Sequence, residues 1–515
     1  MNLKLSFKIC LFVSLMLQGF LPARGTPATN VYNVKDYGAK GDGKQMDAPG
    51  INKAIEAAAA NGGGTVLLPA GVYLSGSIHL KSNINLLIDQ GATLVAAEYG
   101  SGAVYDEPEI TENDKYQDFG HSHWHNSLIW GEKLENVSIT GTGMIYGKGL
   151  ARNSRKTDKA PNKAISLKLC KNVLIRDITI WHGGWFGILA TGVDNLTIDN
   201  IKEDTNRDGM DIDCCHYVNI SNCKINTPLD DGICLKSSFA LNMFRATENV
   251  TITNCIVSGY DEGTVLNGTY KRTPPSDKFD LGPFGRIKFG TESNGGFKNI
   301  AISNCVFDYC RGLAIESTDG ALIEDVSVTN ITMRDIVNSP IYVRIGSRMR
   351  APEGTAIGQI RRMIISNVVV YNADPRQASI ISGVPGGDID DISLHDIRIY
   401  TKGGGTQEQA KREMPEVEKA YPEPERHGIT PAYGFYIRHA KNIDMHDIKI
   451  RAATDDLRPV FFIDDVAGVN LHHINVSRTL KQPTYILKKV KEFNLSQSIG
   501  TADTKVTNTA YKELN

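Results

Sequence analysis

The sequence predicts an all-β chain folded as a right-handed parallel β-helix with a short capping helix at its N-terminal end. A motif of the form Asn-Val-x-Ile-x-Asn-Cys/Ile-x-Ile recurs along most of the chain, at intervals as short as twenty-two to twenty-six residues. Each copy alternates apolar and polar residues, the period of a half-buried strand. Self-similarity at this spacing indicates stacked coils. A β-sandwich would instead show strands about every 8–12 residues without it. The copies begin at Asn136, Asn172, Asn195, Tyr217, Asn249, Asn299, Asp325, Arg362, Asp391, Asn442 and Gly468.

Each coil is expected to turn at the asparagine that follows its first apolar pair. Stacked copies of this residue would hydrogen-bond up the ladder. In three copies a cysteine follows directly, at Cys223, Cys255 and Cys305. Cysteines that keep the register of a repeat are more often small buried hydrophobes than disulfide partners, so we expect mostly free thiols. The turn asparagines are Asn200, Asn222, Asn254, Asn304, Asn330 and Asn367.

The N-terminal end departs from the repeat. Residues 52–60 are strong helix formers ahead of Asn61 and three glycines, which predicts a helix that covers the first coil. Two insertions, at about 259–285 and 402–431, are expected on the binding face. The second contains a helix-compatible charged run from Gln407 to Tyr421.

The first 25 residues are typical of a secretory signal peptide. Lys4 and Lys8 precede an apolar run from Ile9 to Leu21 and then Pro22-Ala23-Arg24-Gly25. The run is shorter than the ~20 residues that span a bilayer. We therefore expect an exported periplasmic or extracellular protein without membrane insertion, and a single catalytic domain over 26–515.

Composition excludes one partner class. The formal charge is −2, spread along the chain, so no basic stripe is available for a phosphate backbone. We expect no nucleic acid partner, no cofactor and no metal, and a monomer.

Two acidic clusters twenty-two residues apart are the main candidate site. Asp208 belongs to Asn206-Arg207-Asp208-Gly209, and Asp230 and Asp231 precede Gly232. One repeat between them would stack Asp208 against the pair, at the ~4.8 Å spacing of adjacent strands. Carboxylates that close resist joint ionisation, which supplies the acid and the base that glycosidic hydrolysis requires. Either cluster alone would be read as a turn.

These motifs resemble glycoside hydrolase family 28, the polygalacturonase and rhamnogalacturonan hydrolase group. The opening from Val31 to Gly43 resembles the start of many pectin-active β-helix enzymes, and the match extends to Asn475. The resemblance implies that Asp230 is the general acid and that Asp208 and Asp231 activate water, with inversion. It implies α-galacturonosidic bonds in pectic polysaccharide as the substrate. We expect substrate contacts from Asn206, His182, Trp185, Arg286, Lys288 and Glu316.

The chain departs from the family pattern twice. The stretch from Gly285 to Glu292 replaces Gly-His-Gly without a histidine, and Ala314-Ile315-Glu316 stands where the family has Arg-Ile-Lys. Glu316 would repel a carboxylate, so a neutral leaving sugar, as in rhamnogalacturonan, is one alternative. The other is that cations elsewhere replace the missing ones, with Lys271, Arg272, Arg286, Lys288 and Arg344 as candidates.

Three further features leave alternatives open. His121, His123 and His125 alternate and suit a metal, but a loop that hydrogen-bonds sugar is the favoured interpretation. Trp181 and Trp185 could stack on sugar, although such aromatics are more often core. A calcium-dependent lyase and a non-catalytic carbohydrate-binding β-helix remain rival functions.

Overall fold

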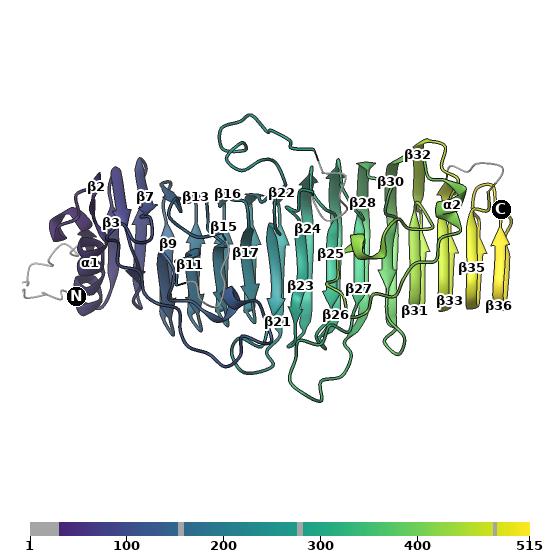
Figure 1. Ribbon diagram of the computed structural model, residues 1–515, viewed down its shortest axis with the longest axis horizontal. Coiled ribbons are helices and arrows are strands. Elements are labelled where there is room, and N and C mark those ends of the chain that lie inside the picture. The colour runs from purple at the N-terminus through teal and green to yellow at the C-terminus, as the bar shows by residue number, and fades with distance from the viewer. Residues whose placement is uncertain (1–29, 153–158, 275–281, 477–481) are drawn as a thin grey trace, which may run out of the picture. The chain divides into compact units, whose positions relative to one another are not determined.

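The computed structural model describes residues 30–152, 159–274, 282–476 and 482–515, so the predicted leader at 1–25 lies outside the described residues. The strands stack in chain order into three parallel ladders, which confirms the parallel β-helix (Figure 1). Contacts join Val31–Asn515 into one compact unit. Within the described residues, no helix has both the length and the apolarity to cross a membrane.

The first ladder carries the two acidic clusters. It is built from β5 (Ile78–His79), β8 (Ile129–Glu132), β11 (Lys163–Lys168), β14 (Phe186–Thr191), β17 (Asp208–Asp213), β20 (Ile233–Ser237), β23 (Ile287–Ser293), β25 (Leu313–Ser317), β27 (Ile341–Ile345), β29 (Ser379–Ser382), β31 (Phe435–His446), β33 (Phe461–His472) and β35 (Tyr485–Ser496).

The second ladder holds most of the motif copies. Its strands are β1 (Val31–Asn33), β3 (Gly64–Leu68), β6 (Ile84–Ile88), β9 (Glu135–Thr140), β12 (Lys171–Arg176), β15 (Asp194–Asp199), β18 (His216–Ser221), β21 (Thr247–Thr253), β24 (Phe297–Asp308), β26 (Leu322–Arg334), β28 (Gln359–Ala373) and β30 (Ile389–Gly403). The third contains β2 (Asp42–Met46), β4 (Gly71–Ser75), β7 (Ala92–Ala96), β10 (Met144–Tyr146), β13 (Thr179–Trp181), β16 (Lys202–Asp204), β19 (Lys224–Asn226), β22 (Ile256–Ser258), β32 (Lys449–Thr454) and β34 (Asn475–Val476).

Stacks of identical apolar positions fill the interior of the coils. Ile188, Met210, Ile233 and Ile287 stand in register on four successive strands, and all four are fully buried. In each copy, every second residue therefore points into the interior and stacks on the residue at the same position of the next coil. Burial of these rows is the main apolar stabilisation of the solenoid.

The turn asparagines behave as predicted. All six have a left-handed backbone, with φ between 52° and 58°, a conformation that asparagine tolerates better than most residues. Their side chains extend the ladder: the Asn254 amide donates to Asn222 at 3.4 Å, and the Asn330 amide donates to Asn304 at 3.1 Å. The eight cysteines from Cys170 to Cys310 are free and buried, as predicted.

Both ends of the stack are covered. Helix α1 (Ala48–Ala60) packs on the first coils, which confirms the capping helix, and η1 (Val34–Tyr37) precedes it. At the other end β36 (Thr504–Leu514) pairs antiparallel with β35, an element that the repeat pattern did not predict.

The second insertion is wrapped rather than helical. Only α2 (Gln407–Ala410) is α-helix in the run predicted from Gln407 to Tyr421, and η3 (Pro424–His427) follows it. Pro415 prevents a single helix through the run, because it lacks an N–H and disfavours helix in the residue before it. A loop after β7 contains η2 (Phe119–Ser122) and lies over the first ladder, where His121 bonds to Asp211 of β17.

Candidate active site

The three aspartates lie together at the start of two adjacent strands. The Gly209 N–H donates to the Asp231 carbonyl at 3.0 Å, so Asp208 stands one coil from the Asp230–Asp231 pair. One carboxylate oxygen from each of the three residues lies within 4.8 Å of the others. Asp208 and Asp231 are buried, whereas the Asp230 side chain is 19% exposed. The predicted register is therefore present, and Asp230 is the member nearest solvent.

Glycine after each acidic cluster permits this approach. A Cβ at Gly209 would lie 2.5 Å from the Gly232 carbonyl oxygen and 2.7 Å from a methyl group of Ile225. Any other residue would force the two coils apart and separate the carboxylates that they carry.

Buried cations hold one carboxylate ionised. Arg286 Nε lies 2.8 Å and Lys288 Nζ 3.2 Å from Asp231. Burial alone would raise the pKa of Asp231, but Lys288 and Arg286 outweigh it, and the pKa lies well below its usual value. Asp231 is therefore a carboxylate at any pH at which the protein would work.

The other two carboxyls retain protons more readily. Burial, followed by the charges of Asp230 and Asp211, raises the pKa of Asp208 well above its usual value. Burial raises the pKa of Asp230 as well, against the opposing charge of Arg207 at 2.8 Å. The cluster thus combines a fixed anion with two groups that compete for a proton, as expected for close carboxylates.

Three residues predicted to touch substrate are instead buried beneath the site. The side chains of Arg286, Lys288 and Glu316 are at most 1% exposed. Lys288 lies 3.6 Å from Glu316, and burial raises the pKa of Glu316 to about 8. Arg286 contacts Asp231 and Glu423, and Lys288 contacts Asp231 and Glu316, which corrects the prediction that these residues bind sugar directly. The reason is that a later part of the chain covers them.

That cover is the 402–431 insertion, whose role the sequence pattern did not reveal. Glu423 accepts from Arg286 at 2.5 and 3.1 Å and from Arg311 at 2.7 Å. Tyr421, 42% exposed, lies over Lys288 with its hydroxyl 2.8 Å from Thr291 Oγ1. Nothing in the local sequence signals a contact between residues 137 positions apart.

The other candidate cations bind elsewhere. Arg272 pairs with Asp335, Lys271 with Asp261, and Arg344 donates to the Glu416 carbonyl and to Ser382. Lys236, which sequence reasoning missed, lies next to the cluster, 3.0 Å from Glu292 and 3.7 Å from Asp211. Its charge lowers the pKa of both Asp208 and Asp230.

Of the three remaining predicted contacts, Asn206 and Trp185 lie near Asp230 and His182 lies among other residues. Asn206 lines a pocket of about 420 Å³ together with Pro228 and Leu229, the residues just before Asp230. Trp185 is 9% exposed, stacks on Phe186, and has the Arg207 guanidinium 5.2 Å from its ring centre.

His182 lies between charged and aromatic neighbours rather than free in the cleft. It bonds to Glu262, which also pairs with Arg152 at 2.6 Å, and its ring stacks on Trp181 at 4.8 Å. Trp181 in turn stacks on Tyr146 at 4.4 Å, so the half-buried rings form a small platform.

The three alternating histidines do not converge. His121 bonds to Asp211, His123 to Asp114, and His125 to Glu132. Of the three histidines, His125 alone belongs to a group that could hold a metal ion, with Glu109 and Glu132; among the described residues the Asp208, Asp230 and Asp231 cluster is the other such group. Separate carboxylate partners account for each ring.

A family model described as rhamnogalacturonase A/epimerase, pectate lyase-like, matches residues 31–310. This chain belongs to that family. It is a glycosidase of the family 28 type.

Individual relatives agree with the family. An exopolygalacturonase of Platanus acerifolia is 25% identical over 405 residues, covering 73% of this chain and 92% of that protein. An exo-poly-alpha-D-galacturonosidase of Dickeya chrysanthemi is 26% identical over 290 residues, covering 55% of this chain and 41% of that protein. The solved structure of a Thermotoga maritima exopolygalacturonase shares the fold, with a TM-score of 0.55 and 17% identity over 94% of both chains.

Proposed function

We propose that this glycosidase hydrolyses α-galacturonosidic bonds in pectic polysaccharide by acid–base catalysis with inversion. The observation that carries the proposal is the group of three carboxylates from two adjacent coils, of which two buried cations keep one ionised. The names of the polygalacturonase relatives support the choice of substrate.

Each carboxyl is assigned the catalytic role that its surroundings favour. Asp230, partly exposed and with a raised pKa, gives its proton to the glycosidic oxygen as the bond from that oxygen to the anomeric carbon breaks. Asp208 and Asp231 hold the attacking water. As the water oxygen bonds to the anomeric carbon, Asp208, which has the higher proton affinity of the two, takes the proton that the water loses. Asp208 then loses this proton to solvent and Asp230 takes one up, which restores the starting state.

Arg286, Lys288 and Glu423 act as positioning residues in this proposal. Arg286 and Lys288 keep the Asp231 carboxylate ionised from beneath, and Glu423 holds Arg286 in place. Positive charge is thus present although the Gly-His-Gly and Arg-Ile-Lys motifs are missing. It is directed at the water-binding carboxylate.

The 402–431 insertion favours action at chain ends. Met414 packs on Ala314, Tyr342 and Ile380, so the ladder face directly after the catalytic coils is occupied by the chain itself. A polysaccharide running along the ladder would meet this segment, which is consistent with exo cleavage. We further propose that the enzyme is exported and acts as a monomer.

The rhamnogalacturonan alternative loses its main support. It required Glu316 to face the leaving sugar, whereas Glu316 is fully buried and lies next to Lys288. We therefore retain galacturonan as the proposed substrate.

The test replaces Asp230 with asparagine and uses Asp391→Asn, an exposed turn position, as the matched control. We expect D230N to lose about 10²- to 10⁴-fold in kcat on polygalacturonate, and D391N to lose nothing. Proton NMR of the first product distinguishes inversion from retention. Near-normal turnover by D230N, or an ultraviolet-absorbing product that requires calcium, would refute hydrolysis by this cluster.

A further inference from the structure

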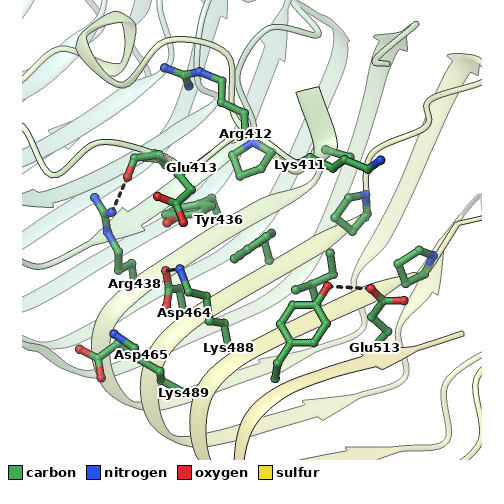
Figure 2. Close-up of a pocket in the computed structure, with 18 of the residues that line it drawn as sticks. Lys411, Arg412, Glu413, Tyr436, Arg438, Asp464, Asp465, Lys488, Lys489 and Glu513 are labelled. Carbon is green, nitrogen blue, oxygen red and sulfur yellow. Dashed lines mark hydrogen bonds and ion pairs between the residues drawn. The ribbon is translucent and has the colours of Figure 1, made fainter. Parts of the chain in front are cut away.

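A second pocket lies on the same ladder face, beyond the insertion. It encloses about 890 Å³ between the insertion and strands β31, β33 and β35 (Figure 2). Register places Ala314, Tyr342, Ile380 and Tyr436 on successive strands after Lys288. Four strand spacings separate the pocket from Lys288 by about 19 Å. Its size is within the range of sites for small molecules.

Three aromatic rings line the pocket; Tyr436 is only 2% exposed, so Phe462 and Tyr511 offer the accessible faces. The Tyr436 and Phe462 rings are stacked, with centroids 5.5 Å apart and planes 26° apart. Tyr511 from β36 is 55% exposed and also lines the pocket. Flat faces of this kind suit the apolar side of a pyranose ring, whereas the hydroxyls need polar groups around them.

The charged groups around the rings are unevenly satisfied. Four of the five acidic groups already have partners: Lys488 lies 3.4 Å from Asp464, His439 lies 2.7 Å from Asp465, Arg438 lies 3.2 Å from Glu416, and the Tyr511 hydroxyl donates to Glu513.

Donors, in contrast, remain available. The side chains of Lys411 and Lys489 form no hydrogen bond or ion pair with any described residue, and both residues are exposed. Figure 2 shows them on two sides of the pocket. Arg438 is already engaged: it is 3% exposed, donates to the carbonyls of Met414 and Pro415 and pairs with Glu416. Against the two lysines stands one acid, Glu413, without a partner among the described residues.

We propose that this pocket is a second carbohydrate site that binds an acidic oligosaccharide, with sugar rings on Phe462 and Tyr511 and carboxylates at Lys411 and Lys489. The site holds a polyuronate chain to the enzyme without taking part in cleavage. We rest the identity of the ligand, though not the existence of the pocket, on the proposed function.

The test uses the full-length D230N variant, which binds without cleaving, and a hexamer of α-linked galacturonate as the probe. Isothermal titration calorimetry should give two hexamers per chain. Lys411→Glu with Lys489→Glu should weaken the second event at least about tenfold, because two charge-assisted contacts are lost. The control Lys53→Glu with Lys505→Glu changes the net charge equally at exposed positions away from the pocket.

The outcomes separate this inference from the proposed function. One hexamer bound, unaffected by K411E/K489E, would overturn the second site and leave catalysis standing. Two hexamers bound to D230N, together with an active wild type, support both proposals. Equal binding of a neutral maltohexaose at the second site would overturn the acidic specificity. On otherwise wild-type enzyme, K411E/K489E should slow turnover of the polymer and leave that of the trimer unchanged.

Discussion

Replacing Glu423 with glutamine removes the carboxylate that joins the insertion to the catalytic coils while keeping the size of the side chain. Glu423 accepts two hydrogen bonds from Arg286 and one from Arg311, and all three side chains are at most 8% exposed. Breaking a buried ion pair on one side typically costs about 3–5 kcal/mol. We expect E423Q to lose about that much free energy of unfolding.

The same substitution should also reduce activity. Without Glu423, Arg286 is left with Asp231 as its main partner, which draws the carboxylate toward the cation and lowers its pKa further. Displacement of a positioned group by about 1 Å can cost ~10²-fold in rate. We therefore expect kcat on polygalacturonate to fall by roughly 10- to 100-fold.

Urea unfolding followed by circular dichroism and a reducing-end assay measure the two effects. Glu425→Gln is the matched control, because Glu425 lies on the same turn but has only longer contacts, with Arg311 at 3.5 Å and the Asn338 amide at 3.4 Å, and burial raises its pKa toward the neutral form. If E423Q is no less stable and no less active than E425Q, the structural role assigned to Glu423 is wrong.

Two further outcomes follow from the site. The acidic limb of the profile of kcat/KM against pH should lie above pH 3.8, because burial raises the pKa of Asp208 and the water-binding pair is lost when that group gains a proton; a limb below pH 3.8 contradicts this assignment. Because Asp208 and Asp230 interact, the two limbs belong to the pair, and the alkaline limb should disappear from the residual activity of D230N, which has no acid at position 230. Gly209→Ala should leave the circular dichroism spectrum unchanged but lower kcat at least about tenfold, since its Cβ would press on the Gly232 carbonyl and part the coils. Wild-type kcat in G209A would show that the close approach of the coils is dispensable.

The structural features that could be predicted from the sequence are those that repeat from coil to coil or that depend on neighbouring residues. The period of the motif predicts the ladders, the left-handed asparagine turns and the free cysteines, because each depends on a residue and its copy one coil away. The same spacing predicts the meeting of Asp208 with Asp230 and Asp231. Helix α1 followed from a run of strong helix formers before a glycine-rich stop.

Features that depend on distant contacts could not be predicted in this way. Glu316 appears in the sequence as a charge facing substrate, and only the packing of Tyr421 and Glu423 shows that it is covered. The run from Gln407 to Tyr421 has helical composition, but its side chains gain more from contact with the ladder than one helix interrupted by Pro415 would give. The antiparallel strand β36 carries no repeat pattern at all.

The pairing of Arg286 with Glu423 also determines at which point of its synthesis the enzyme can become active. Coils can stack from the amino end as they leave the ribosome, and the aspartates would then be in place early. The anion that balances their supporting arginines emerges more than a hundred residues later. A nascent chain halted before that point would have complete catalytic coils, but the supporting arginines would lack their anionic partner. In refolding, the recovery of turnover should therefore lag behind the recovery of β structure.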